Sequence, residues 1–487
     1  MSIASDASLH SGTVHSKRWV AFGVLILASF MNLIDVSIVN VALPQIQADT
    51  GATPTQLEWV AAIYVLALAA GILPFGRFGD VFGRRKLFIG GLIGFTVSSA
   101  VCGLAPDVVT LIAARAAKGI AAAMMVPQVL AIANVIFPPE EKARVFGLFG
   151  TVSSLAVVAG PIIGGALITA DTTGLGWRLA FLINLPFGIA ALIGARIFIP
   201  LLETDSEART DWIGTTLFTV AAVLLVLPLI EGRALGWPWW SFAALFAAIP
   251  ATLAFVAFER RRSAKGLSAL MPPGLLSNGP YLRRLGLVTL FCSGVPGLFL
   301  VLAIFLQSGF GLTALQSGLV TTPFPVGVML ASMTTERLGN RYLSARIATG
   351  AALLMFGMIA LQWVIRSIGA DLNPYAFTIP LLVCGFGMGT AIMSLFQVTM
   401  SSVAPKDAGA GSGAMQAFQQ IGAALGIAIA GQIFFGLLGE NGMAAGAATT
   451  PRFVEAAATA TTYSIAVFAT LTGLVGVSAW RTRKDTT

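Results

Sequence analysis

The sequence predicts an all-α polytopic membrane protein of about fourteen transmembrane helices, with no soluble domain of any size. Of its 487 residues, 56% are hydrophobic and only 10% are charged. A soluble domain carries roughly 25% charged residues, because water must wet its surface. The chain also contains 53 glycines, which allow membrane helices to approach one another closely. Lipid must therefore be part of the solvent of this chain.

Fourteen apolar stretches are long enough to cross the hydrocarbon core of a bilayer, which takes about 20 residues of helix. We place them near 19–40, 58–75, 87–104, 109–133, 145–168, 179–200, 212–230, 239–258, 285–308, 315–335, 344–365, 375–398, 411–437 and 460–480. The first stretch follows a polar tail and has no small-residue cleavage site. We therefore expect a helix that starts membrane insertion and is not removed.

The basic residues are distributed unequally between the two sides of this array. Cytoplasmic loops of membrane proteins carry an excess of Lys and Arg. Of the 29 basic residues, 22 lie on the side of both termini, three lie within spans, and four lie on the other side, namely Arg178, Arg233, Arg366 and Arg452. We therefore expect both termini in the cytoplasm. The net charge of +8 then faces an anionic inner leaflet and does not indicate a nucleic-acid partner.

The spans divide the chain into five segments. These are a cytoplasmic tail (1–18), a six-helix bundle (19–200), a linker with two extra helices (201–284), a second six-helix bundle (285–480) and a cytoplasmic tail (481–487). Short loops with Gly and Arg occupy corresponding places in the two bundles, at 76–86 and 336–346. Duplicated helical blocks around a central site are a common plan of secondary transporters, which work by alternating access.

The first of four motifs is the predicted loop GRFGDVFGRRK at 76–86. Its glycines permit a tight turn, and its basic run anchors the loop at the anionic leaflet. One acid, Asp80, stands among these cations at a helix end. The residues of this motif expected to matter for conformational change are Gly76, Asp80, Gly83, Arg84 and Arg85. A loop that only sets the topology is the alternative interpretation.

The second motif, LIDVSIVNVALP at 33–44, places a carboxylate inside the first span. Asp35 costs several kcal/mol in the membrane unless it is paired, hydrated or protonated. Desolvation favours the protonated form of such a group. A group that can be loaded and unloaded with a proton is what a proton-coupled carrier requires. A wetted Asp that caps a neighbouring helix is the alternative.

The third motif, LIAARAAKG at 111–119, places two cations in the fourth span. A guanidinium does not deprotonate, so Arg115 needs a carboxylate or carbonyl partner inside the membrane. Asp35 is the acidic candidate, and a switchable contact between the two would connect protonation to helix movement. Lys118 adds a second cation nearby. An arginine that extends its head group to the membrane surface is the alternative.

The fourth motif is GPIIGG in the fifth span, which begins at Gly160 and is preceded by Gly150. Gly160 and Gly164 stand one turn apart and form a groove for close packing, and Gly165 completes the motif. Pro161 removes a backbone donor and bends the helix. Any tightly packed helix bundle can use such a pattern, so the motif is informative only together with the others.

Together these motifs resemble those of the fourteen-span drug:proton antiporters of the major facilitator superfamily, over nearly the whole chain. The resemblance implies two six-helix bundles plus two extra central helices. It also implies that Asp80 latches the two halves by facing a helix N-terminus near 407–412, where the helix dipole is positive. In this family the fourth motif marks exporters. Val81 and Lys118 depart from the family pattern, which usually has a basic residue and Gln there; further matching residues are Trp177, Arg178, Asn184 and Pro186.

Several chemistries are absent from the sequence. It contains no G-x-x-x-x-G-K-[ST] phosphate loop, so ATP is not the direct energy source. The two histidines, His10 and His15, lie in the N-terminal tail, which leaves no His metal site and no His-dependent catalytic set. The cysteines lie far apart in apolar stretches and indicate small core residues; they are Cys102, Cys292 and Cys384. We expect no enzymatic activity, no metal and no cofactor, with the proton as coupling ion.

Polar and aromatic residues in the spans expected to line the cavity are candidates for substrate contacts. Amides and aromatic rings accept varied shapes and can stack on cations. The candidates, each of which also fits packing or interhelical hydrogen bonding, are Asn32, Trp59, Tyr64, Gln128, Gln307, Phe324, Gln397, Phe418 and Gln419. Asp35 is the only acid far from a predicted helix end, which favours neutral or monovalent substrates over divalent cations. The acids at span ends are Glu58, Glu231 and Glu259.

Residues and resemblance together predict a proton-coupled exporter of lipophilic, neutral or monovalent cationic molecules in the cell membrane, with Asp35 and Arg115 in proton coupling. We expect small drug-like molecules and membrane lipids as partners, no nucleic acid, and function as a monomer. Two alternatives share the fold. Proton-coupled uptake of a nutrient is disfavoured by the fourth motif and the extra helices, and a lipid or glycolipid flippase would need a lateral opening lined by apolar side chains. A channel is disfavoured because no filter segment occurs.

Overall fold

The computed structural model describes residues 3–171, 174–201, 211–265, 270–271, 273–338, 342–368, 373–404, 407–438 and 450–484. Outside this description also lie the side chains of 3–17, 80, 139, 142–144, 146–147, 150–151, 153–154, 157–158, 273, 336–338, 408–409, 450 and 476–484. The secondary structure of the described residues is helical, without a strand. This confirms the expected all-α class.

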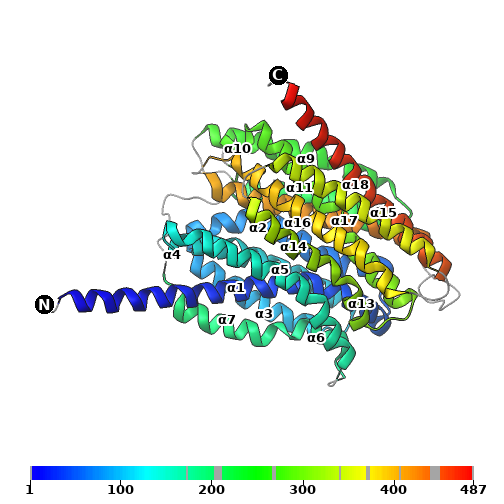
Figure 1. Ribbon diagram of the computed structural model, residues 1–487, viewed down its shortest axis with the longest axis horizontal. Helices are drawn as coiled ribbons and strands as arrows, with labels where there is room; N and C mark the ends of the chain where they lie inside the picture. Colours follow the sequence, from blue (N-terminus) through cyan, green and yellow to red (C-terminus); the bar gives the residue numbers. More distant parts are fainter. Residues whose placement is uncertain are drawn as a thin grey trace.

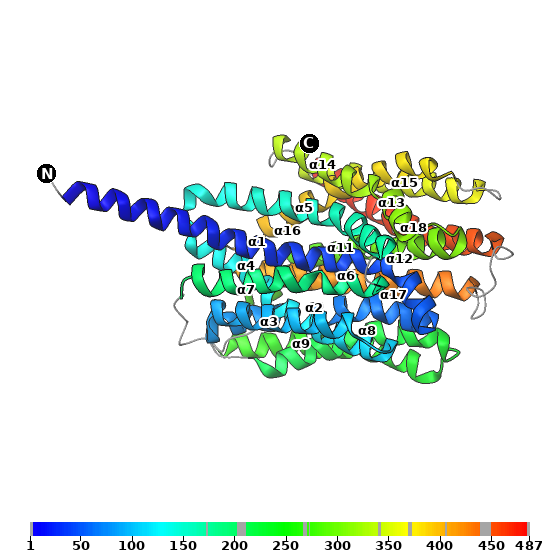
Figure 2. The same cartoon turned by 90° about the horizontal axis from the view of Figure 1, so that it is seen from below.

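The first bundle begins with a long helix. Its helices are α1 (Ile3–Thr50), α2 (Pro54–Phe82), α3 (Arg84–Gly103), α4 (Val108–Ile136), α5 (Pro139–Ala170), η1 (Gly176–Arg178), α6 (Leu179–Leu182) and α7 (Asn184–Phe198). A capping box of Thr53 and Gln56 satisfies free backbone N–H groups at the start of α2. The N-terminal part of α1 extends beyond the bundle (Figure 1, Figure 2). The expected separate tail is thus continuous with the first span from Ile3.

The remaining helices form the extra pair and the second bundle. They are α8 (Trp212–Ala234) and α9 (Trp239–Ala264), then α10 (Pro273–Leu276), α11 (Gly279–Ser293), α12 (Pro296–Ile304), η2 (Phe305–Gly309), α13 (Ala314–Thr321), α14 (Pro323–Leu338), α15 (Leu343–Ser367), η3 (Pro374–Phe377), α16 (Thr378–Ser401), α17 (Ala408–Leu438) and α18 (Thr450–Lys484). Two expected spans are divided at Pro296 and Pro323, because proline has no N–H to donate to the preceding turn.

Thirteen helical stretches among the described residues are long and apolar enough to cross a membrane. They match thirteen of the expected spans in order. The remaining expected span, 145–168, lies within α5, a helix of 32 residues whose described apolar part is Ala159–Ala170. The number fourteen therefore stays a prediction, although every expected span falls on a helix.

The two bundles lie side by side (Figure 1) and contact each other most extensively through two of the helix pairs that join them. α2 packs against α17, and α5 packs against α13, so each pair joins the first bundle to the second. The extra helices α8 and α9 lie along one edge of the molecule (Figure 2). There α8 packs against both α2 and α17. The extra pair therefore contacts both bundles and does not separate them.

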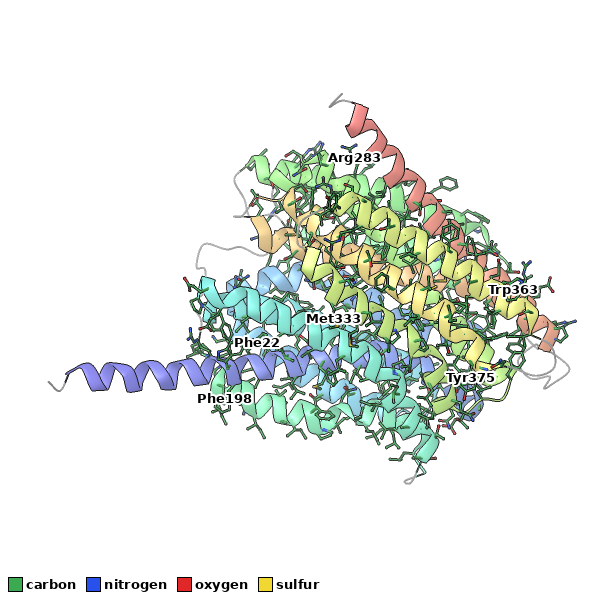
Figure 3. The ribbon with its side chains drawn as sticks, viewed as in Figure 1. Phe22, Phe198, Arg283, Met333, Trp363 and Tyr375 are labelled. Carbon is green, nitrogen blue, oxygen red and sulfur yellow. The ribbon has the colours of Figure 1, made fainter. Side chains whose placement is uncertain are left out.

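The outer surface of the helix array is apolar. Large exposed side chains on it include Val109, Ile197, Phe246, Leu253, Phe356 and Ile379. Trp363 and Tyr375 lie at the end of the molecule opposite to the free part of α1 (Figure 3) and are 71% and 85% exposed. Aromatic residues are enriched at membrane–water interfaces. This surface fits a lipid environment, as the composition predicted.

The expected basic loop after the second span is not a loop. Gly83 alone joins α2 to α3, with φ of +97°, a conformation that glycine adopts at little cost. Arg84 Nη1 donates a hydrogen bond to Ala131 O at 3.0 Å, and Arg85 Nη2 donates one to Arg196 O at 2.6 Å. Arg196 lies in the last turn of α7, where a cation stabilises the negative helix end, and Ala131 lies in the turn of α4 before its last one. Both arginines thus bind backbone carbonyl groups of neighbouring helices.

Candidate proton-coupling and substrate site

Asp35 lies at the centre of a buried polar cluster in the first bundle. Arg115 Nη1 donates to Asp35 Oδ2 at 2.6 Å, and Lys118 Nζ donates to Asp35 Oδ1. Asn184 Nδ2 lies 3.4 Å from the same Oδ1, and Arg115 Nε donates to Val60 O at 3.0 Å. The side chains of Asp35, Arg115 and Lys118 are at most 1% exposed. The expected Asp35–Arg115 contact is confirmed, and the alternatives of a wetted Asp and of an Arg that reaches the membrane surface are wrong.

Helix geometry brings these groups together. Arg115 and Lys118 stand three residues apart on α4, so their side chains share one face of the helix, and that face meets Asp35 on α1. Asp107 caps the start of α4 by accepting a hydrogen bond from the backbone N–H of Thr110 at 2.8 Å. That bond holds the pKa of Asp107 below its usual value. The cap satisfies a backbone N–H group that would otherwise be free at the start of α4.

Aromatic rings surround the two cations. Arg115 Cζ lies 4.5 Å from the centroid of the Tyr64 ring. Lys118 Nζ lies 4.6 Å from the centroid of Phe95 and 5.3 Å from that of Phe181. Cation–π contacts at these distances stabilise a desolvated positive charge. Tyr64, a predicted substrate residue, thus belongs to the coupling cluster; its hydroxyl also donates to Oδ1 of another candidate, Asn32, at 2.5 Å.

At one end of the molecule, called the closed end here, the two bundles touch. Leu315 N on α13 donates to Thr169 Oγ1 on α5 at 3.0 Å. A Cβ built at Gly165 would lie 2.7 Å from Leu315 Cα, and one built at Gly318 would collide with the backbone of Pro161. Only glycines permit this approach. The fourth motif therefore forms part of the contact between the bundles.

The other glycines of the fourth motif face a different neighbour. Gly160 lies against Ser37 and Gly164 lies against Ile38, both on α1 of the same bundle. A Cβ at either position would require the neighbouring side chain to move. The expected groove for close packing is confirmed, although it holds α1 and not the second bundle. Gly150 is among the positions outside the side-chain description.

A cavity of about 430 Å³ lies between the bundles at the opposite end, called the motif end because it includes the first motif. α2 and α4 form one wall, and the start of α17 forms another. Gly76 of the first motif lines it, together with the polar residues Arg77, Gln128, Asp407 and Ser412. α17 begins within 407–412 as expected. The side chain of Asp80 lies outside the described part of the structure, so the proposed latch stays a prediction.

A second cavity, of about 920 Å³, lies at the closed end. Trp59, Glu231 and Arg233 border it. Trp59 Nε1 donates to Glu231 Oε1 at 2.5 Å, and Arg233 Nη2 lies 3.4 Å from Oε1 of the fully buried Glu58. Glu259 is fully buried as well. Divalent cations were disfavoured because Asp35 is the only acid far from a predicted helix end and such a carrier needs more than one buried carboxylate. Glu58 and Glu259 are buried as well as Asp35, so that reason for excluding divalent cations is wrong. A position near a helix end does not mean exposure where another helix covers that end.

The predicted substrate residues do not line one cavity. Gln128 borders the motif-end cavity and donates to Phe75 O at 2.8 Å, whereas Trp59 borders the closed-end cavity. Gln307 Nε2 donates to Val41 O at 3.0 Å and so joins the two bundles.

The remaining candidates lie in the second bundle. Phe324 is buried, with its ring edge-to-face against Phe299 at 4.9 Å. Phe418 lies 6.4 Å from the ring of Phe218 on α8. Gln397 is exposed and Gln419 is partly buried. Residue type identified polar and aromatic positions within spans, but it could not identify the helix face on which each one lies.

Two functional contacts were missed by the sequence reasoning. The direct bond of Lys118 to Asp35 could have been found, because the spacing of three from Arg115 places both cations on one face. The Glu58–Arg233 pair had a weaker signal. Arg233 is one of the few basic residues on its side of the array, and it needed an acidic partner.

Comparisons with known proteins identify the family. Residues 25–427 match the family model described as Major Facilitator Superfamily. The chain is 36% identical over 431 residues to the probable actinorhodin transporter of Streptomyces coelicolor, covering 88% of this chain and 75% of that one. It is 31% identical over 475 residues to the puromycin resistance protein pur8 of Streptomyces alboniger, covering 95% and 91%.

Solved structures show the same fold. A bacterial homologue of the human lysosomal transporter Spinster, in an inward-facing and unoccupied conformation, superposes with a TM-score of 0.65, covering 96% of this chain and 98% of that one. The two chains share 16% sequence identity, so this similarity concerns the fold alone. With the family match and the relatives above, it shows that this chain belongs to the Major Facilitator Superfamily and is a multi-pass transporter of the cell membrane.

Proposed function

We propose that this chain exports lipophilic small molecules in exchange for protons. The observation that carries the proposal is the buried cluster of Asp35, Arg115 and Lys118. Ionisable groups inside a membrane are costly and mark transport or proton pathways. Asp35 and Arg115 connect α1 to α4, so a change of protonation in this cluster changes how two helices of the first bundle are held together.

The names of the relatives support export of drug-like molecules. They include a tetracenomycin C resistance and export protein of Streptomyces glaucescens, 30% identical over 426 residues, and a cephamycin export protein of Amycolatopsis lactamdurans, 34% identical over 425 residues. Two cavities at opposite ends, one of them between the bundles, support transport by alternating access.

The motif end faces the cytoplasm in this proposal. The basic residues Arg77, Arg84 and Arg85 lie there, as the positive-inside rule requires, and both termini are then cytoplasmic. A substrate would enter the motif-end cavity from the cytoplasm or the inner leaflet and leave when the closed end opens. The protein acts as a monomer and needs no cofactor.

The proton gradient supplies enough free energy. One charge that crosses 100 mV releases ~2.3 kcal/mol, which holds a concentration gradient of roughly forty-fold at 1.4 kcal/mol per tenfold. If a monovalent cation is exchanged for one proton, the voltage term cancels and the pH difference alone drives transport.

Inverted membrane vesicles with an acidic lumen test this function directly. Ethidium and a neutral lipophilic dye should accumulate in the lumen, and a protonophore should abolish the accumulation. Asp107→Asn is the matched control, because Asn caps a helix as well as Asp and residue 107 lies outside the cluster; this variant should transport like the parent. Transport of dye with protons into the cytoplasm would indicate uptake, and lipid movement without dye transport would indicate a flippase. Either result would overturn the proposal.

A further inference from the structure

The cluster around Asp35 contains more positive than negative charge. Arg115 and Lys118 both donate to the one carboxylate. The other described groups that face the cluster from neighbouring helices are Asn32 on α1, Tyr64 on α2, Phe95 and Cys102 on α3, Phe181 on α6 and Asn184 on α7. At neutral pH, none of these side chains ordinarily carries a negative charge. With both cations protonated, the group carries a net charge of +1.

A buried charge without a counter-charge is strongly disfavoured, so one group must be able to lose a proton. Arg115 cannot, because a guanidinium stays protonated in proteins. Lys118 can, because an amine loses a proton readily when it is buried. After that loss, the neutral amine still has N–H groups to donate to Asp35 Oδ1. The cluster would keep its hydrogen bonds and become electrically neutral.

Asp35 is poorly placed to take up the exchangeable proton in this arrangement. Both of its oxygens accept from donors, Arg115 at Oδ2 and Lys118 and Asn184 at Oδ1. An added carboxylic acid proton would point at groups that are themselves donors.

We propose that Lys118 carries the exchangeable proton of this transporter, while Asp35 stays ionised and holds Lys118 and Arg115 in place. The step is R–NH₃⁺ → R–NH₂ + H⁺ at Nζ, and it changes the charge of the cluster from +1 to 0. The rings of Phe95 and Phe181 stabilise the charged form, and burial stabilises the neutral form. When the cluster is exposed to one side of the membrane or to the other, that exposure selects between the charged and the neutral form of Lys118. This inference rests on the proposed proton-coupled export and names the residue that performs it.

Two substitutions at Lys118 separate the possibilities. Lys118→Arg keeps a permanent charge, and Lys118→Gln removes it, so neither variant can cycle a proton. Spin labels on cysteines at Val135 and Ser401 report the motif end, since both residues are exposed and lie on opposite bundles. The three native cysteines are buried, so they should not react with the label.

In the parent protein, one exchangeable proton should change the ratio of the two conformations by up to tenfold per pH unit across the range in which that proton is taken up and released. Both Lys118 variants should lose this dependence, with Arg and Gln held at opposite ends of the parent's range. The matched control is Lys265→Gln, an exposed lysine at the end of α9, which should behave like the parent. A pH gradient should drive ethidium accumulation by the parent and by the Lys265→Gln control. It should drive none by either Lys118 variant.

Retention of the parent's pH dependence in Lys118→Gln would overturn the assignment. If the parent protein transports no ethidium, the proposed export function is refuted. The pH dependence of the distances between the spin labels still decides whether Lys118 carries the proton. If neither Lys118 variant folds, infrared difference spectra of the parent with ¹³C-labelled aspartate decide. A labelled carboxylic acid band at the acidic pH would place the proton on Asp and refute the proposal, and its absence would support Lys118.

Discussion

Gly165→Ala tests whether the contact between α5 and α13 closes one end of the transporter. A Cβ at this position would lie 2.7 Å from both Ala314 O and Leu315 Cα, and 2.9 Å from Leu315 N. These are backbone atoms, so rotation of a side chain cannot relieve the overlap. Ordinary van der Waals contact begins at 3.4 Å, so the helices must separate by roughly 0.7 Å at this point.

The cost of that separation falls on one conformation only. α5 and α13 belong to different bundles, and their contact exists while the closed end is closed. Overpacking of this kind typically costs about 1–3 kcal/mol. Such a free-energy difference changes the ratio of two states by about 5–150-fold. We therefore expect Gly165→Ala to shift the population toward the conformation that opens this end.

Spin labels on cysteines at Leu104 and Tyr375 measure the shift. These residues are 70% and 85% exposed and lie at the closed end on opposite bundles. Longer distances should gain population in Gly165→Ala. The matched control is Gly164→Ala, where the added Cβ meets Ile38 on α1 of the same bundle. This control should lower thermal stability without changing the distances between bundles.

Two results would refute the reasoning. An unchanged distance distribution in Gly165→Ala would mean that the α5–α13 contact does not hold the end closed. An equal shift in Gly164→Ala would mean that the effect comes from general loosening of α5.

Two further substitutions test the buried ion pairs. Asp35→Asn removes the carboxylate between Arg115 and Lys118, and loss of one partner of a buried pair costs about 3–5 kcal/mol; we expect a lower thermal midpoint in detergent and no proton-driven ethidium transport in inverted vesicles. Glu58→Gln leaves Arg233 without its carboxylate partner at the closed end, and we expect a loss of about 1–3 kcal/mol, seen as a lower midpoint with transport retained.

The exposed pair of Asp49 and Arg178 provides the control for both. Its charged atoms lie 2.6 Å apart, but the side chains are 48% and 25% exposed. Arg178→Ala should therefore cost at most about 1 kcal/mol. If Arg178→Ala lowers stability more than Glu58→Gln does, the conclusion that buried ion pairs contribute more to stability than exposed ones is contradicted.

The sequence by itself determined the class of the protein, the order of its spans, the two bundles and the Asp35–Arg115 pair. Hydropathy and charge are local properties, so a stretch of about 20 apolar residues indicates a span wherever it stands. A carboxylate and a guanidinium inside spans also need partners, and few acids were available to Arg115.

Only the tertiary structure decided which neighbour each residue faces. Gly164 and Gly165 are adjacent in the sequence, but at 3.6 residues per turn they point about 100° apart. One therefore meets α1 and the other meets α13. Burial of Glu58 likewise depends on coverage by α8 and α17, which lie far away in the sequence. The charge balance at Asp35 depends on Lys118 sharing its carboxylate, because electrostatic interactions act across space between helices and not along the chain.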